Sequence, residues 1–177
     1  MTTLRKFMRH LPPDGKVRNA FRSFNLAPKA GGQVPSVKAL AETLGFAVER
    51  VDLPSGMAGR LTPDPFSFNG YRIEVNANDS VLRQRFTVVH EIVHYFVHPN
   101  HADPFAPDKL RDDKDHLYLS EEQREESEAN RFAAAIFFDE GALAAARSLH
   151  GDDLTKLSRH FGVSEKVVEI ALKQDIY

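Results

Sequence analysis

The chain has 177 residues, of which 42% are hydrophobic, and it carries no cysteine and a formal net charge of −2. This composition predicts a globular chain that buries a core, and it excludes disulfides and thiolate metal ligands, so a metal would be held by histidine or carboxylate groups. No apolar run reaches membrane-spanning length, and the first 15 residues lack the apolar run of a secretory signal. We therefore expect a cytoplasmic protein that does not enter a membrane.

Residues 1–32 form a basic arm in which seven Lys and Arg residues face a single acid, Asp14, giving a net charge of +6 against −8 for the remainder. The basic residues are Arg5, Lys6, Arg9, Lys16, Arg18, Arg22 and Lys29. Two proline and glycine pairs, Pro12-Pro13 and Gly31-Gly32, break the arm into short pieces. We expect it to dock on the acidic remainder or to bind nucleic acid or an acidic partner.

The first regular elements after the arm are a helix and a strand. Ser36 is a suitable N-cap for a helix over residues 37–44, and Gly45 supplies the left-handed stop. Residues 46–53 alternate in hydrophobicity, which is typical of a half-buried strand.

A turn-rich stretch over residues 54–70 precedes a second strand, Tyr71 to Asn76, with Ile73 and Val75 on one face. We expect the edge of this second strand to be available for an extended peptide.

A strongly apolar helix follows around residues 85–98 and is expected to stop at Pro99, because proline disfavours helical geometry in the preceding residue. Residues 100–119 are rich in proline and aspartate and predict a long loop. Ser120 and Gln123 have capping-box spacing, so a second long helix is expected to begin there.

The apolar helix contains a His-Glu-x-x-His motif. Residues four apart on a helix lie on one face, so His90 and His94 can both bind one cation. Glu91 would stand beside the metal as a general base, acting on a water molecule whose pKa the metal lowers from 15.7 toward about 7.

A catalytic site of this type needs a third protein ligand. The metzincin pattern fails, because the positions that it requires as glycine and histidine are Val97 and Asn100. Nearby, His98 lies another turn along the helix and His101 lies past the proline. A peptide deformylase is excluded because its ligand is a cysteine.

The other common solution is a glutamate from the following helix. Five acids are available there, and helical angle alone does not choose among them, since several flank the same apolar stripe. They are Glu121, Glu122, Glu125, Glu126 and Glu128.

Several motifs in order resemble the ImmA/IrrE family of metallo-endopeptidases: a strand ending in Val75-Asn76, an Arg-Phe-Thr lead-in at residues 85–87, the HExxH helix, and an E-x-E-A-N-x-F-A helix over residues 126–133. The resemblance covers residues 34–138. It implies that Glu126 is the third ligand and that Asn130 orients a ligand histidine.

The chain departs from the family pattern at two places. Residues 136–139 read Ile-Phe-Phe-Asp where Leu-Leu-Met-Pro is common, and Val93 stands where a small residue is frequent between the histidines. Neither departure affects a proposed ligand.

Residues 151–173 predict two short helices around Gly162, with apolar and turn positions that fit a helix-turn-helix. The second helix begins Ser164-Glu165-Lys166 and also contains Glu169, which is poorly suited to a groove lined by phosphates. Packing on the metal domain is the alternative to DNA reading, and the family commonly carries such a pair after its peptidase core.

These features predict an α+β zincin-like domain over residues 33–140, preceded by the basic arm and followed by a helical, HTH-like extension over residues 141–177. The resemblance implies a Zn²⁺-dependent endopeptidase whose substrate is a repressor, an antitoxin or another regulator of helix-turn-helix type. Candidates for an oxyanion donor are Tyr95, His116 and Tyr118. The competing function is a non-catalytic, metal-containing regulatory or toxin-antitoxin component that binds a protein partner or DNA.

Overall fold

The computed structural model describes residues 3–27, 29, 33–101, 116–139 and 141–174, with the backbone alone for residues 116–121 and 174. The helices are α1 (Leu4–Phe7), α2 (Gly15–Leu26), α3 (Val37–Thr43), α4 (Val81–Val97), α6 (His116–Phe138), α7 (Ala142–His150), α8 (Leu154–Phe161) and α9 (Glu165–Gln174). The strands are β1 (Ala47–Val51), β2 (Gly59–Pro63) and β3 (Tyr71–Asn76). The fold is α+β, as the sequence predicts.

The three strands form one sheet in the order β1-β3-β2, in which β1 runs parallel and β2 antiparallel to β3. Ile73 and Val75 of β3 are both buried, as their alternation predicts. The prediction that β3 offers a free edge is wrong, because β3 is the central strand. Strand β2 was not predicted from the sequence; it lies inside the stretch interpreted as turn-rich and is one edge of this sheet.

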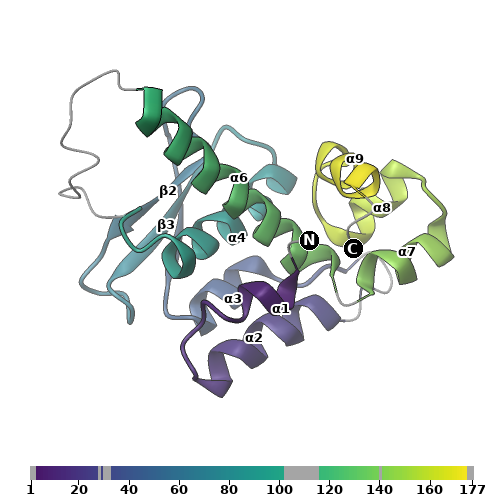
Figure 1. The fold of residues 1–177 in the computed structure, drawn as a ribbon, viewed down its shortest axis with the longest axis horizontal. Coiled ribbons are helices and arrows are strands. Elements are labelled where there is room, and N and C mark those ends of the chain that lie inside the picture. Colours follow the sequence, from purple (N-terminus) through teal and green to yellow (C-terminus); the bar gives the residue numbers. More distant parts are fainter. Residues whose placement is uncertain (1–2, 28, 30–32, 102–115, 140, 175–177) are drawn as a thin grey trace.

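Helix α6 crosses the middle of the molecule and contacts elements from both ends of the chain (Figure 1). Helix α4 packs between α6 and the sheet. Helices α1 to α3 lie at the bottom of the view in Figure 1, and α7 to α9 lie at the right. None of the helices in the described part of the chain is long and apolar enough to cross a membrane.

The helix ends predicted from the sequence are confirmed in part. The Ser36 side chain accepts a hydrogen bond from the Ala39 N–H at 3.1 Å, and Gly45 has a φ of 94°. Helix α4 ends just before Pro99, as expected. The predicted start at Ser120 is wrong, because α6 begins one turn earlier at His116. Of the predicted loop over residues 100–119, residues 102–115 lie outside the described residues.

The described residues of the basic arm pack on the rest of the chain. Phe7 is fully buried, and its ring centroid lies 4.9 Å from that of Phe21 and 5.6 Å from that of Phe132 in α6. The Asn25 side chain donates to the Ile136 carbonyl at 3.0 Å. Helices α1 and α2 therefore share the hydrophobic core formed by the other elements.

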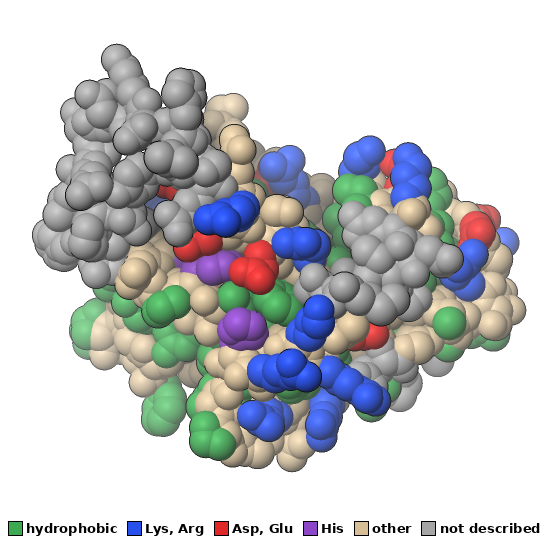
Figure 2. All heavy atoms as spheres, viewed as in Figure 1, with side chains coloured by type: hydrophobic (Ala, Val, Ile, Leu, Met, Phe, Trp, Pro, Cys, Tyr) green, Lys and Arg blue, Asp and Glu red, His purple; other side chains and the backbone are tan. Residues whose placement is uncertain are grey.

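The basic side chains of the arm gather on the surface below this contact (Figure 2). Four arginines, Arg5, Arg9, Arg18 and Arg22, line a cavity of about 480 Å³ between α1 and α2. The Arg18 Nε atom is buried and has no hydrogen-bond partner among the described residues.

The C-terminal helices join the same core. The predicted pair around Gly162 is confirmed as α8 and α9, and Gly162 has the left-handed φ of 66°. The Arg85 guanidinium of α4 donates to the Gly162 carbonyl at 2.8 Å. Phe138, one of the residues that depart from the family pattern, is buried against Phe161 with ring centroids 4.8 Å apart.

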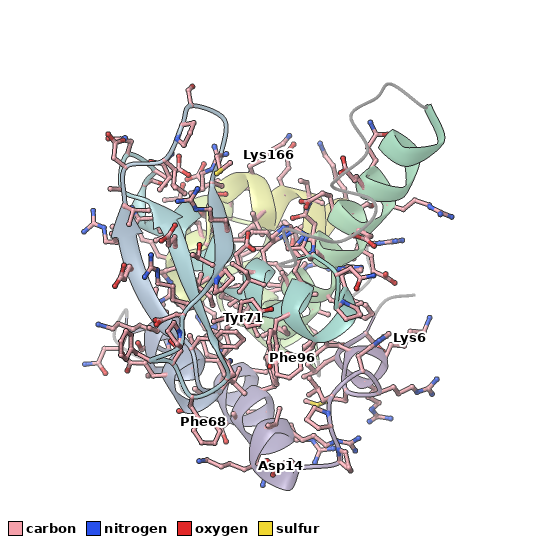
Figure 3. All side chains as sticks on the ribbon, turned by 90° about the vertical axis from the view of Figure 1, so that its left-hand side faces the viewer. Lys6, Asp14, Phe68, Tyr71, Phe96 and Lys166 are labelled. Atoms are coloured by element: carbon pink, nitrogen blue, oxygen red, sulfur yellow. The ribbon has the colours of Figure 1, made fainter. Side chains whose placement is uncertain are left out.

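Aromatic side chains lie both inside and outside the fold (Figure 3). Tyr71 and Phe96 lie within the molecule, packed against the core. Phe68 points outward from the β2–β3 connection and is 98% exposed.

The packing of α1 predicts the effect of truncating its central aromatic residue. Phe7→Ala removes a fully buried ring that packs against two other rings, and it should lower the free energy of unfolding by about 3–5 kcal/mol. Phe66→Ala is the matched control, since Phe66 is 97% exposed, and it should change the value by less than about 0.5 kcal/mol. Urea denaturation of both variants provides the measurement. Equal stability of the two would mean that α1 is not part of the core.

Candidate metal centre

Two histidines and one glutamate meet where α4 packs on α6. His90 and His94 lie on one face of α4, with their Nε2 atoms 2.9 Å apart. The two carboxylate oxygens of Glu126, on α6, each lie 3.1 Å from one of these nitrogens. The structure thus brings together the residues that the motif and the resemblance single out.

The hydrogen bond made by Nδ1 of His90 determines which of the two ring nitrogens carries the proton. His90 Nδ1 lies 3.0 Å from Asn130 Oδ1, an oxygen that only accepts hydrogen bonds. Nδ1 must therefore carry the hydrogen, which leaves a lone pair on Nε2 in the neutral ring. This is the contact expected of a residue that orients a ligand histidine.

A chain of two hydrogen bonds determines which ring nitrogen of His94 carries the proton. The Glu128 carboxylate lies 3.2 Å from His98 Nε2, and His98 Nδ1 lies 3.1 Å from His94 Nδ1. Because a carboxylate accepts, His98 donates to Glu128 through Nε2 and accepts from His94 through Nδ1. His94 then presents an unprotonated Nε2 toward Glu126. The sequence pattern did not distinguish Glu128 from the solvated acids of α6, so this role was not predicted.

The electrostatics of the group favour a positive charge at its centre. Burial lowers the pKa of His94 to about 4, so this ring is neutral at physiological pH. Burial also lowers the pKa of His90, but the hydrogen bond to Glu126 and the charges of Glu91 and Glu126 outweigh it and raise that pKa. Hydrogen bonds to the two histidines hold the pKa of Glu126 well below its usual range.

The donors fit a small divalent metal such as zinc. A tetrahedral site with bonds of about 2.0–2.1 Å separates its ligand atoms by roughly 3.3 Å, close to the 2.9 and 3.1 Å found between these atoms. Two neutral imidazoles and one carboxylate are also a ligand set that catalytic zinc uses. The three donor atoms all lie within 4.8 Å of one another.

Glu91, the residue after His90 in α4, lies beside this group. It is 4% exposed, and its Oε2 atom is buried with no hydrogen-bond partner in the part of the chain that the structure describes. His101 Nε2 approaches that oxygen to 3.7 Å, and the His101 ring stacks on His94 with centroids 3.5 Å apart. A buried carboxylate oxygen without a donor is costly, which marks it as a position where a ligand or water can bind.

These residues line a cavity of about 730 Å³. Its walls include His90 and Glu91 of α4, Glu126 of α6 and residues 54–59, which lead into β2. The side chain of Asn76 holds that loop, since it donates to the carbonyls of Leu53 and Met57. The asparagine that ends β3 therefore shapes the cavity, a role that its place in the motif did not reveal.

The remaining candidates lie away from the group or outside the described residues. Tyr95 packs against Phe46 and Tyr71 in the core and does not line the cavity, so the prediction that it faces the site is wrong. The side chains of His116 and Tyr118, and that of Glu121, belong to the part of α6 for which only the backbone is described. His101 lines the cavity instead.

The other acids of α6 with described side chains do not join the metal donors. Glu122 and Glu125 lie outside the His-His-Glu group, and Glu122 lines a neighbouring cavity. Among the described side chains of α6, Glu126 is therefore the acid that completes the group.

Residues 41–173 match the model of the Peptidase_M78 family, described as an IrrE N-terminal-like domain. The chain belongs to this family. Peptidase_M78 proteins are metallopeptidases, which agrees with the His-His-Glu group at the α4–α6 contact. The match extends through α7, α8 and most of α9. A comparison with curated proteins finds no match.

The lead-in to the Peptidase_M78 histidine motif has a structural role at each position. Arg85 donates to the Gly162 carbonyl and, at 2.8 Å, to the Pro35 carbonyl, so it ties α4 to segments on both sides. Phe86 lines the metal cavity, and Thr87 packs against the backbone at Gly59.

The close approach of β2 to α4 depends on Gly59. A Cβ atom at this position would lie 2.4 Å from Thr87 Cγ2 and 2.9 Å from the Glu74 carbonyl oxygen, with Glu91 Cγ at 3.6 Å. A side chain cannot fit there unless the strand moves away from the helix that carries Glu91.

Gly59→Ala should therefore destabilise the fold by about 1–3 kcal/mol, the usual cost of overpacking. Gly15→Ala is the control, because a Cβ there meets nothing within 4 Å and its φ is ordinary, and it should be neutral or slightly stabilising. Thermal and urea unfolding of both variants gives the comparison. A Gly59→Ala protein as stable as the Gly15→Ala protein would contradict the close packing of β2 on α4.

Proposed function

We propose that this Peptidase_M78 protein is a zinc-dependent endopeptidase in which His90, His94 and Glu126 hold the metal and Glu91 is the general base. The observation that carries the proposal is the buried Glu91 oxygen in the wall of the cavity, which accepts no hydrogen bond from the described residues and lies next to three convergent metal donors. A site that only stabilised the fold would have no use for a buried carboxylate oxygen without a hydrogen bond.

A zinc ion held there would supply Lewis acidity, which polarises a peptide carbonyl and acidifies a water molecule. Glu91 accepts the proton of the attacking water and delivers it to the leaving amine. Asn130 and the His98 to Glu128 pair keep the ligand nitrogens in the unprotonated form that binds a cation.

The substrate is proposed to lie extended along β2. This strand is an edge of the described sheet, and the loop before it lines the cavity. An edge strand offers unpaired backbone groups to a peptide, so cleavage would require an unfolded or exposed segment.

The substrate class that we propose is a transcriptional regulator of helix-turn-helix type or an antitoxin. Its basis is the resemblance of the ordered motifs to the ImmA/IrrE family. Because such regulators act on DNA, we also propose that the enzyme works in the cytoplasm.

Two substitutions distinguish the role of the general base from that of a metal ligand. Glu91→Gln should retain zinc but reduce cleavage of the regulator substrate by about a hundredfold or more, the scale of general-base catalysis. Glu126→Ala removes a ligand oxygen and should weaken zinc affinity. Removing a residue that only hydrogen-bonds to a ligand costs roughly 10–100-fold in affinity, and the loss for Glu126→Ala should be larger. Competitive zinc titration and gel-based cleavage assays measure the two effects.

Glu125→Ala is the matched control on α6, and both its zinc affinity and its activity should remain close to those of the unmodified protein. If Glu91→Gln cleaves at the unmodified rate, the peptidase mechanism is wrong. If Glu125→Ala loses zinc while Glu126→Ala retains it, the ligand assignment is wrong.

A second candidate function is nucleic-acid binding by the basic helices, in a regulatory component that need not be catalytic. The supporting observation is the cavity between α1 and α2, which four arginines line and where the buried Arg18 Nε has no hydrogen-bond partner among the described residues. Arg18 and Arg22 are four residues apart on α2, a spacing at which like charges repel unless an anion lies between them. By contrast, the basic residues on α9 are compensated, because Lys166 and Lys173 both pair with Glu169.

The double variant Arg18→Gln/Arg22→Gln should reduce the slope of log affinity against log salt by about 1.8 for a DNA duplex, because each phosphate that is no longer neutralised lowers the slope by about 0.9. The control is Lys38→Gln/Arg50→Gln, which removes the same charge outside this cavity and should leave the slope nearly unchanged. Fluorescence anisotropy at several salt concentrations makes the measurement. Equal slopes for the two double variants would exclude this cavity as the binding surface.

A further inference from the structure

A second cavity, of about 650 Å³, lies between α6 and α9 and adjoins the metal cavity. Phe86, Glu126 and Asn130 line both. The other residues around the second cavity are Glu122, Gln123, Ser127, Arg131, Ala134, Val167, Ile170 and Ala171. A chain bound in the metal cavity therefore lies next to a second space that the C-terminal helix α9 lines.

The floor and far wall of this cavity are apolar. Phe86 contributes from α4, Ala134 from α6, and Val167 and Ile170 from α9. Ile170 is 44% exposed, although α9 buries Val168 and Ala171 in the core. An isoleucine left partly in water beside a catalytic centre gains free energy when an apolar group covers it.

The rim of the cavity is polar and carries acids. Glu122 and Glu126 stand on the α6 side of the opening. Arg131 lines the same cavity, and Glu126 is assigned to the metal, so the sign of these charges does not discriminate. The apolar wall is what selects against polar and charged side chains.

We propose that this cavity is the specificity pocket of the peptidase and that it holds a large apolar side chain of the substrate residue next to the scissile bond. The inference rests on the proposed peptidase function and adds the class of residue that is recognised. The cavity lies within the roughly 300–1,000 Å³ of sites that hold small ligands, so it accommodates a leucine or phenylalanine side chain.

This assignment gives α9 a role in recognition. The helix is attached to the peptidase core through the Arg85 contact with the Gly162 carbonyl at the α8–α9 turn. Its apolar face then forms one side of the substrate site, and changes on that face alter specificity without touching a metal-binding residue.

The test uses Ile170→Arg, a substitution at a partly exposed position that the fold tolerates. Leu149→Arg is the matched control, because Leu149 is 74% exposed on α7 and does not line the cavity. The probes are leucine hydroxamate and glycine hydroxamate, which bind the zinc-loaded protein through the same metal-binding group. Calorimetry gives the ratio of their dissociation constants.

The unmodified protein and Leu149→Arg should bind leucine hydroxamate about ten to a hundred times more tightly than glycine hydroxamate, the usual discrimination of an apolar pocket. Ile170→Arg should reduce that ratio by about tenfold. Equal affinities in the unmodified protein, or an unchanged ratio in Ile170→Arg, would overturn the pocket assignment.

Hydrolysis of a mixed peptide library distinguishes failure of the pocket from failure of the peptidase function. Enrichment of large apolar residues at one position beside the cleaved bond, reduced in Ile170→Arg and retained in Leu149→Arg, supports the assignment. Cleavage without such a preference overturns the pocket and leaves the peptidase function standing. An absence of cleavage, combined with selective binding of leucine hydroxamate, overturns the peptidase function alone.

Discussion

The packing of α4 on α6 is the contact on which the rest of the molecule depends. Ala129 and Ala133 of α6 are fully buried, as are Ile92 and Val93 of α4, and all four belong to one hydrophobic core. Val93, where the family often has a smaller residue, is thus accommodated in the core. The metal donors lie along one edge of it, so a hydrophobic interface determines the separation of the polar groups.

Hydrogen bonds offset the cost of placing those polar groups there. His94 is fully buried and would be expensive to desolvate without a partner for each nitrogen. The path through His98 to Glu128 supplies a partner for Nδ1. The unprotonated Nε2 cannot accept from the Glu126 carboxylate that faces it, and a metal ion held by the two groups would be its partner. Among the side chains of this centre that the structure describes, Glu91 keeps a buried oxygen without a hydrogen bond. The desolvation cost that no hydrogen bond offsets thus falls on Glu91, the residue that we propose as the general base.

The two ends of the chain are organised around the same long helix (Figure 1). Helices α1 and α2 bury aromatic residues against α6, and α9 faces α6 across the second cavity. The helical extension consequently borders the cavity next to the metal centre, whereas the basic arm packs on α6 through the hydrophobic core. Their exposed faces differ, because the arginines of α1 and α2 cluster around a cavity while the lysines of α9 pair with Glu169.

The sequence by itself determined what depends on local geometry and on motif order: the α+β class, the pairing of His90 with His94 by helical spacing, the α8–α9 turn at Gly162, and the family. The geometric evidence for which acid meets the histidines came only from the tertiary structure. The angular positions of neighbouring glutamates on a helix differ too little to choose among them. The tertiary structure also showed that β3 is central, that Gly59 brings β2 against α4, and that Glu128 and His101 belong to the site. Each of these depends on contacts between segments far apart in the chain, which hydrophobic periodicity does not encode.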